Sequence, residues 1–437
     1  MSVNAPLPQT SGRRTRITRI TRERNKLIAF AVLFVVAMLY PLVGRPIFAL
    51  FDPNNKTLFG DITASLNTTL IFTLLAVGLN IVVGYAGLLD LGYAAFFAIG
   101  GYTMGFLTSQ QSPLYDTPFH TNFWVALPIS FLMAALFGVL LGAPTLGLKG
   151  DYLAIVTLGF GEIVPITFNT LNKITKGDSG LAGLIQPNLF GFQFTASTVE
   201  AWYWLAILVV ALSIFLARRL IDSRVGRAWM AMREDEIAAS AMGINLVRTK
   251  LLAFGLGASF AGFAGAIAAN SQGSANPSQF RYDVSIFVLS MVIFGGIGNL
   301  WGVIAGSFIL SLTDRQLIPF FTGLVKNYAE GIELTTQIDA NGVRVTEPNI
   351  WKDIVTNVGS DSRLFIFGLI LVTMMLLRPE GLFPSGRRKM EMHTGDSKDM
   401  QTKMIRSENP LENFEESHNL NRNPSITEDS GSPKDTE

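Results

Sequence analysis

Long apolar runs, separated by short polar segments, constrain the fold of this chain more than any other feature. A helix needs about 20 predominantly apolar residues to cross a membrane, and roughly 17 to 25 are tolerated. Charged residues make up only 15% of the chain, whereas about 25% is typical of soluble proteins. We expect ten spans, near residues 27–43, 64–84, 88–108, 124–147, 152–170, 201–217, 250–270, 284–299, 301–320 and 363–378. The sequence therefore predicts an all-α integral membrane protein.

Some of these helices are expected to be broken. The run 152–170 contains Glu162 and a proline, and the run 284–299 is short. Either run fits a re-entrant or half-crossing element as well as a full span. A glycine cluster around Asn299 predicts a broken helix or tight hairpin, and it loosely echoes an earlier cluster around Asp90. The expected fold therefore has about ten transmembrane or half-spanning helices.

The positions of the basic residues predict the orientation of the chain, because Lys and Arg beside a span resist transfer across the membrane. Seven basic residues and one acid lie in the tail 1–26, and seven basic residues lie in the polar segment 218–250. We expect both segments in the cytoplasm. Ten spans also place the C-terminus there, and they place the loop 319–362 outside.

Composition divides the chain into three regions. The basic tail 1–26 precedes a transmembrane domain, 27–378, and a polar tail, 379–437, follows it. The second tail is rich in Ser, Asn, Glu and Lys, so we expect it to be disordered. The run 27–43 resembles a secretory signal, but it is long and no small-x-small site follows it, so we expect an uncleaved first span.

Several kinds of site are missing from the sequence. The chain has no Cys, so neither a disulfide nor a thiolate metal site is possible. The three histidines lie outside the apolar runs, and no G-x-x-x-x-G-K-[ST] phosphate loop occurs. We expect no metal, no cofactor, no nucleic-acid partner and no ATPase site. Any energy from ATP would have to come from a partner protein.

The polar segment 218–250 carries a pattern of its own between two spans. Four apolar residues recur at roughly helical spacing, and four charged residues crowd the opposite side, before a glycine that can stop a helix. They are Trp229, Met232, Ile237 and Met242 on the apolar side, Arg233, Glu234, Asp235 and Glu236 on the charged side, and then Gly243. The pattern predicts one amphipathic helix over 225–242. Such a helix can rest on anionic lipid or receive a partner protein.

The order of residues in this segment resembles that of a known family. Glu236, Ala238, Ala239 and Gly243 have the spacing of the cytoplasmic loop by which ABC importer permeases dock their ATPases. Longer segments resemble the branched-chain amino-acid permease family of high-affinity ABC importers, over about residues 60–380. These segments are LAVGLNIVVGYAGLLDLGYAAFFAIGGYT, KGDYLAIVTLGFGEI, ARRLIDSRVGRAWMAMREDEIAASAMGINLVRTKLLAFGLGASFAGFAGAI and FGGIGNLWGVIAGSFI.

The resemblance implies a permease subunit in the plasma membrane of a prokaryote. Its implied partners are a second permease subunit, two cytoplasmic ATP-binding subunits, an external binding protein that delivers leucine, isoleucine or valine, and membrane lipid. In this interpretation the helix 225–243 transmits ATPase movement to the translocation path. The expected coupling residues are Arg233, Glu234, Asp235, Glu236, Ala239 and Gly243. The first three of them would contact the ATPase.

Other residues are candidates for the path or for helix packing. The candidates for the path are Asp90, Gly92, Tyr93 and Glu162. A charge inside a span is costly, so Glu162 is expected to face the protein interior or an aqueous route. The predicted topology favours a second interpretation of Asp90, as a solvated acid in a cytoplasmic turn. Small residues every four positions, which include Gly257, Ala261 and Gly265, predict close helix packing, with a pore-facing role as the alternative.

Two other functions remain open on the sequence alone. Permeases for urea or short amides share the resembled fold and motifs, so the substrate is not fixed. A protein of a different class, an ion-coupled carrier or a channel, could use the intramembrane acids as coupling sites. Removing an ATPase partner separates this class from the first, because a carrier would keep working.

Overall fold

The computed structural model describes most of the helical part of the chain. The described residues are 38–41, 56–145, 147–148, 150–189, 192–195, 198–319, 336–338, 344–346, 368–369, 372–373, 376 and 381–383. All of them belong to a unit that ends at Pro384. The tail 1–26, most of the first span, most of 319–378 and the tail from 384 onward lie outside the described residues, so what the sequence predicts for them stays a prediction.

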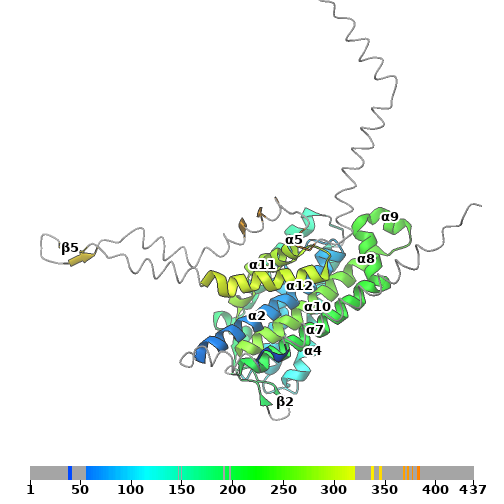
Figure 1. The fold of residues 1–437 in the computed structure, drawn as a ribbon. Coiled ribbons are helices and arrows are strands. Elements are labelled where there is room, and N and C mark those ends of the chain that lie inside the picture. The colour runs from blue at the N-terminus through cyan, green and yellow to red at the C-terminus, as the bar shows by residue number, and fades with distance from the viewer. Residues whose placement is uncertain are drawn as a thin grey trace, which may run out of the picture. The chain divides into compact units, whose positions relative to one another are not determined.

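Helices dominate the described residues (Figure 1). The α-helices are α2 (Lys56–Leu79), α3 (Tyr93–Thr108), α4 (Phe123–Thr145), α5 (Asp151–Thr170), α6 (Asn172–Thr175), α7 (Val199–Asp222), α8 (Arg224–Glu234), α9 (Glu236–Ala241), α10 (Leu246–Gln272), α11 (Tyr282–Gly295) and α12 (Leu300–Leu312). Two π-helical segments, η1 (Asn80–Tyr85) and η4 (Thr313–Leu317), continue α2 and α12, and two 3₁₀ turns are η2 (Gly177–Ser179) and η3 (Pro277–Phe280). This agrees with the all-α expectation.

The few strands are short and antiparallel. β1 (Leu181–Ala182) pairs with β4 (Ser274–Ala275), and β2 (Asn188–Leu189) pairs with β3 (Phe192–Gln193). The third pair is β5 (Thr336–Ile338) with β6 (Arg344–Thr346).

Among the described residues, five helices are long and apolar enough to cross a membrane. They are Ile62–Tyr85, Phe123–Thr145, Asp151–Thr170, Val199–Asp222 and Leu246–Gln272. The run 152–170 forms one continuous helix, α5, with Pro165 inside it, and it is long and apolar enough for a full span. α11 has only 14 residues, or about 21 Å of helix, which is shorter than a membrane core of about 30 Å. The count of ten spans is not confirmed.

Small residues let the central helix α10 lie close to α2, α3 and α4. A Cβ on Gly265 would overlap the carbonyl oxygen of Phe97 in α3, and a Cβ on Gly257 would overlap the side chain of Val82. Ala261 between them is fully buried. Helices whose interface consists of such residues can approach closely enough to make extensive van der Waals contact. All three residues of the small-residue series therefore lie in helix contacts.

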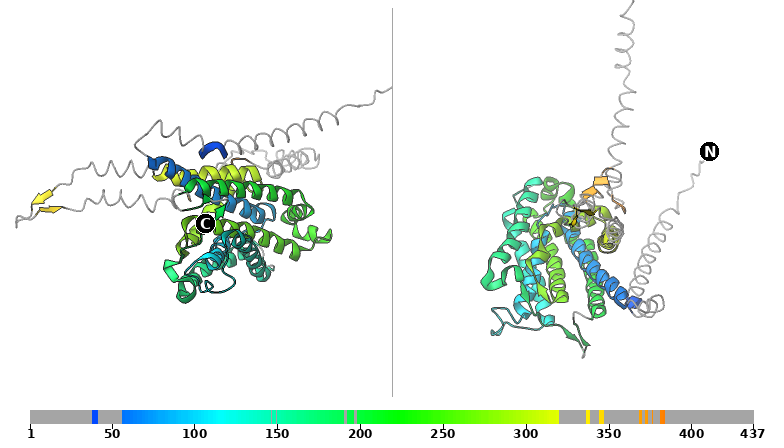
Figure 2. Two further views of the ribbon diagram at one scale, coloured as in Figure 1. Left: turned by 90° about the horizontal axis from the view of Figure 1, so that it is seen from below. Right: turned by 90° about the vertical axis from the view of Figure 1, so that its left-hand side faces the viewer.

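A ladder of hydroxyl groups joins α2 to α12, which lie side by side in Figure 1 and Figure 2. Ser307 Oγ donates to Thr73 Oγ1 at 3.1 Å, and Ser311 Oγ donates to Thr69 Oγ1 at 2.9 Å. All four side chains are buried. Hydrogen bonds of this kind satisfy polar groups that cannot reach water inside a membrane.

The connecting segments gather at two ends of the helices. At one end, α8 lies beside the turn after η1 and the turn between α11 and α12, and α9 follows α8 (Figure 1). At the other end, β1 pairs with β4, and Ser109 forms a bridge with Leu184. Successive long helices run between these two ends, so the described part of the chain has the alternation expected of a multi-pass membrane protein.

Candidate functional site

The segment 218–250 folds into two short helices between α7 and α10. The Ser223 side chain caps the start of α8 and accepts from the backbone N–H groups of Val225 and Gly226. Trp229 is fully buried, and its indole N–H donates to the Thr249 carbonyl oxygen at 2.9 Å. This bond attaches α8 to the first turn of α10.

The prediction of one helix over 225–242 is wrong, because the helix is interrupted at Asp235. This residue is extended, with φ −157° and ψ 114°, and it separates α8 from α9. Its Oδ1 accepts from the backbone N–H groups of Ile237 at 2.7 Å and Ala238 at 3.0 Å. Asp is among the strongest N-cap residues, since its carboxylate satisfies N–H groups that have no partner within the helix. Asp235 therefore starts a second helix rather than continuing the first.

Gly243 ends α9, as the sequence predicted. Its φ is +83°, a conformation that favours glycine. The Gly243 N–H donates to Ser240 O at 3.0 Å, and the Ile244 N–H donates to Ala239 O at 3.1 Å. These two bonds form a Schellman motif, which satisfies carbonyl groups at the end of the helix. Ala239 itself is buried.

The break at Asp235 also separates the apolar residues that were predicted to share one face. Trp229 and Met232 are buried, at 0% and 2% exposure, whereas Ile237 and Met242 are 75% and 83% exposed. The second pair points outward because the extended residue changes the direction of the chain. We call the exposed residues Ile237, Ala238, Ala241 and Met242 the α9 tip.

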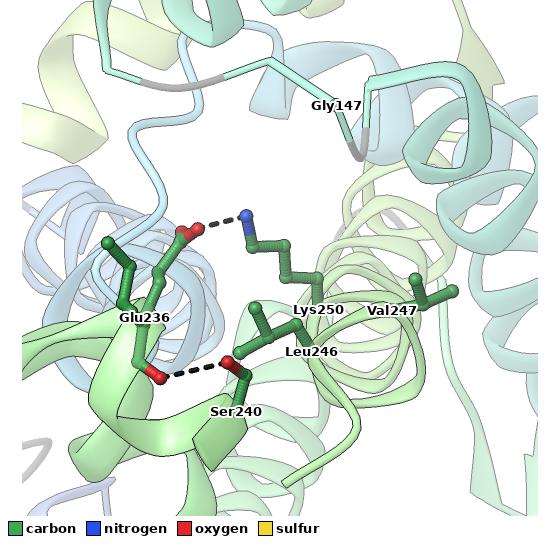
Figure 3. Close-up of a pocket in the computed structure, with 7 residues that line it drawn as sticks. Gly147, Glu236, Ser240, Leu246, Val247 and Lys250 are labelled. Carbon is green, nitrogen blue, oxygen red and sulfur yellow. Dashed lines mark hydrogen bonds and ion pairs between the residues drawn. The ribbon is translucent and has the colours of Figure 1, made fainter.

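The prediction that Glu236 lies on one charged side with Glu234 and Asp235 is wrong. Its side chain points inward, whereas those two residues are exposed. Its Oε1 lies 2.7 Å from Lys250 Nζ, and the two side chains are 26% and 6% exposed. The pair borders a hollow of about 270 Å³ between α9, the start of α10 and Gly147 (Figure 3). The figure shows the carboxylate and the ammonium group pointing toward each other. The ion pair joins α9 to α10.

Arg233 makes a contact that the sequence did not predict. Its Nη1 donates to the carbonyl oxygen of Gly84, at the end of η1. The aliphatic part of the side chain lies against Gly87. Arg233 is therefore bonded to the helical domain itself. Arg233, Glu234 and Asp235 are all exposed, so a partner can still reach all three.

Asp90 is buried and not solvated, so the interpretation that the topology favoured is wrong. Only 1% of Asp90 is exposed, and its Oδ1 accepts from the Gly92 N–H at 2.9 Å. The neighbouring Leu91 N–H donates to Thr157 Oγ1 in α5 at 3.0 Å. The Tyr93 hydroxyl donates to the Gly257 carbonyl oxygen at 2.8 Å. These contacts tie the start of α3 to α5 and α10.

Glu162 lies on the exposed face of α5, so it does not face the interior of this chain. Its exposed neighbours on the same helix are large and apolar: Tyr152, Ile155, Ile163 and Ile166. We expected Glu162 to face either the protein interior or an aqueous route. Its exposed position is compatible only with a route outside the packed interior of this chain.

The sequence analysis missed three buried polar residues. Asn80 lies in η1 and is fully buried, Asp314 lies in η4 beside Arg315, and Lys250 was counted only as a flanking positive charge. All three occur within or at the edge of predicted spans, which is the signal that could have drawn attention to them. Among the described residues, no group of three or more acidic or His side chains could hold a metal ion.

Most of this chain is similar in sequence to known proteins. A family model described as "Branched-chain amino acid transport system / permease component" matches residues 62–356. The high-affinity branched-chain amino acid transport system permease protein LivM of Escherichia coli (strain K12) is 36% identical over 387 residues, 84% of this chain and 78% of that protein. LivM of Salmonella typhimurium is 36% identical over 76% of this chain and 72% of that protein. The ribose import permease protein RbsC of Haemophilus influenzae is 23% identical over 69% of this chain and 87% of that protein. No solved structure gives a significant match.

Proposed function

Because this chain belongs to the family of permease components of branched-chain amino acid transport systems, we propose that it is the transmembrane permease subunit of an ATP-driven importer of branched-chain amino acids. Relatives with 36% identity carry that activity in their names. The helices that are long and apolar enough to cross a membrane support a multi-pass location. The membrane is the plasma membrane of a prokaryote, with the segment 218–250 and both termini in the cytoplasm.

One observation supports the mechanism above all: the segment 218–250 is bonded to the helical domain on one side and exposed on the other. Its inner surface is bonded to the helical domain through Trp229, Arg233 and Glu236. Its outer surface, the α9 tip, is apolar and exposed. Exposed apolar patches with a charged rim are typical of protein interfaces. A partner that binds the α9 tip can therefore move the helices behind it.

The partner at the α9 tip is an ATP-binding subunit. This chain has no phosphate loop, so the energy for transport arrives from another protein. Glu234 and Asp235 lie at the edge of the tip and are exposed, so they contact the ATPase surface. Two such subunits and an external binding protein complete the importer.

A second permease subunit packs against the exposed face of α5. Only 22% of the apolar window of α5 is buried within this chain, compared with 78% for α10. Glu162 lies on that face, and a charge at the centre of a helix in lipid costs about 2.5–3.5 kcal/mol. A neighbouring subunit with a water-filled route between the two chains removes this cost. Glu162 then borders the translocation path.

Substitution of Gly243 tests the coupling role. In the complete importer reconstituted into liposomes, we expect Gly243→Asp to abolish ATP-dependent uptake of labelled leucine. The added carboxylate is unfavourable at a helix C-terminus and beside an apolar docking surface. Gly243→Asn is the matched control, because Asn has nearly the same shape, carries no charge and is accepted at this position of a helix end.

The expected result is loss of uptake and of substrate-stimulated ATP hydrolysis in Gly243→Asp, with both retained in Gly243→Asn and with equal amounts of both variants in the membrane. Unchanged uptake in Gly243→Asp contradicts the coupling role. Wild-type uptake of labelled urea in place of leucine would assign a different substrate. Uptake without ATP or an ATP-binding subunit would indicate a carrier or channel.

A further inference from the structure

Arg233 occupies a slot whose walls are glycine backbone. Its guanidinium group donates to the carbonyl oxygen of Gly84. A Cβ on Gly87 would lie 2.7 Å from Arg233 Cγ, and a Cβ on Gly298 would lie 2.9 Å from Arg233 Nη1. Gly87 and Gly298 also have positive φ, 73° and 80°. Both turns therefore need glycine for their conformation and for the space that Arg233 fills.

The slot joins two turns that are more than two hundred positions apart in the sequence. Asn80, buried in η1, accepts with its Oδ1 from the Gly298 N–H at 3.0 Å. The Gly84 carbonyl that Arg233 binds lies beside the same glycine. π-helical segments such as η1 are rare and frequently occur at functional sites. The end of α2 and the turn between α11 and α12 thus meet at one point.

A third segment is attached to the same turn. The Leu382 N–H donates to the Phe294 carbonyl oxygen at 2.9 Å, and Asn299 Nδ2 donates to the Phe383 carbonyl oxygen at 2.7 Å. Leu382 and Phe383 follow the last predicted span. We call residues 84–87, 296–299 and 381–383 the turn cluster. It connects the ends of α2, α11, α12 and the chain after the last predicted span.

Two links leave the segment 218–250 on opposite sides of the break at Asp235. Arg233, at the end of α8, is bonded to the turn cluster. Glu236, at the start of α9, is paired with Lys250 on α10. The extended residue between them lets the two short helices carry displacement in different directions.

We propose that Arg233 is a positioning residue that makes the turn cluster move with α8 during the ATPase cycle. ATPase movement reaches the broken helices through Arg233 and the central helix α10 through Glu236. The guanidinium group suits this role because it is always charged and its donors have fixed directions, while carbonyl groups at a helix end carry partial negative charge. The inference rests on the proposed function and changes the expected role of Arg233 from ATPase contact to a link within the permease.

The test compares Arg233→Ala, Arg233→Lys and the control Arg224→Ala in the reconstituted importer. Arg224 is exposed at the first turn of the same helix, so its removal changes the net charge by the same amount. Hydrogen bonds to charged groups shift equilibria by about tenfold or more. We expect leucine uptake to fall by about tenfold in Arg233→Ala while ATP hydrolysis continues, so that more ATP is hydrolysed per leucine. Arg233→Lys recovers part of the uptake, and Arg224→Ala resembles wild type.

Hydrogen exchange of the same complexes separates coupling from a general loss of stability. In wild type, ATP binding changes exchange both at residues 84–92 and 296–299 and at α9. In Arg233→Ala we expect the change to persist at α9 and to disappear at the turns. If Arg233→Ala fails to assemble in the membrane, the inference is tested with Arg233→Lys. The same two measurements are made, leucine uptake relative to ATP hydrolysis and hydrogen exchange at the turns and at α9.

The inference is overturned if Arg233→Ala keeps wild-type uptake and its turns still respond to ATP. It is also overturned if the ATP response disappears at α9 together with the turns, because Arg233 would then act on the ATPase contact. Absence of ATP-dependent uptake in wild type itself is a different result, which contradicts the proposed function.

Discussion

At the scale of single residues, three polar contacts hold the segment 218–250 against the helical domain. Trp229, Arg233 and Glu236 each bind a group on another helix. The sequence indicated that such a segment exists, but it could not show these partners. Helical spacing placed Glu236 with the exposed charges, whereas its side chain turns inward to Lys250. The Gly84 carbonyl that binds Arg233 is 149 positions away in the chain, so no local pattern could reveal it.

Neutralising Glu236 tests the ion pair with Lys250. Loss of one partner of a buried pair costs about 3–5 kcal/mol. Because the Glu236 side chain is 26% exposed, we expect Glu236→Gln to destabilise the attachment of α9 by less, about 1–3 kcal/mol. The double variant Glu236→Gln with Lys250→Met removes both charges and should regain stability. Thermal unfolding of the purified complex and hydrogen exchange of α9 measure the effect, and a double variant less stable than Glu236→Gln would show that the pair is not the cause.

At the scale of elements, periodicity predicted the long helices well and the breaks less well. Five predicted spans are present as long apolar helices, and Gly243 ends a helix as expected. The break at Asp235 was missed, although Asp is a strong N-cap residue, because the apolar spacing on either side is compatible with one continuous helix. Pro165 suggested a break in the run 152–170, whereas α5 continues through this residue. The break at Asp235 is made by local hydrogen bonds to Ile237 and Ala238, so it had a signal in the sequence that the apolar spacing masked.

Two glycine substitutions test helix packing around α10. A Cβ on Gly265 would overlap the Phe97 carbonyl oxygen, whereas a Cβ on Gly159 in α5 would meet nothing within 4 Å. We expect Gly265→Ala to destabilise the protein by about 1–3 kcal/mol, because the backbones must move apart. Gly159→Ala should be neutral or stabilising by up to about 1 kcal/mol, since Ala favours helix over Gly. Thermal unfolding in detergent compares them, and equal effects would argue against close packing at Gly265.

At the scale of the whole molecule, the class of protein could be predicted and the arrangement of its site could not. Apolar runs predicted a multi-pass membrane protein, and four sequence segments predicted its family, which the matches confirm. The position of Asp90 depends on how the turn between η1 and α3 packs against other helices, and that of Glu162 depends on how α5 is rotated about its axis. Composition and hydropathy do not determine these positions. Asp90 is buried against the favoured expectation, and Glu162 is exposed, which leaves the aqueous route as its one compatible expectation.

Cross-linking from the α9 tip tests most directly the claim that an ATP-binding subunit pushes on this segment. The chain contains no Cys, so Met242→Cys introduces a unique thiol for a photoactivatable maleimide. Met242 is 83% exposed on the α9 tip, and Phe119→Cys, at a residue 68% exposed near the opposite end, is the matched control. We predict that a transport-active complex forms a cross-link to the ATP-binding subunit from position 242 and none from position 119. A cross-link from position 242 to the external binding protein, or none to the ATP-binding subunit while uptake continues, would contradict the mechanism.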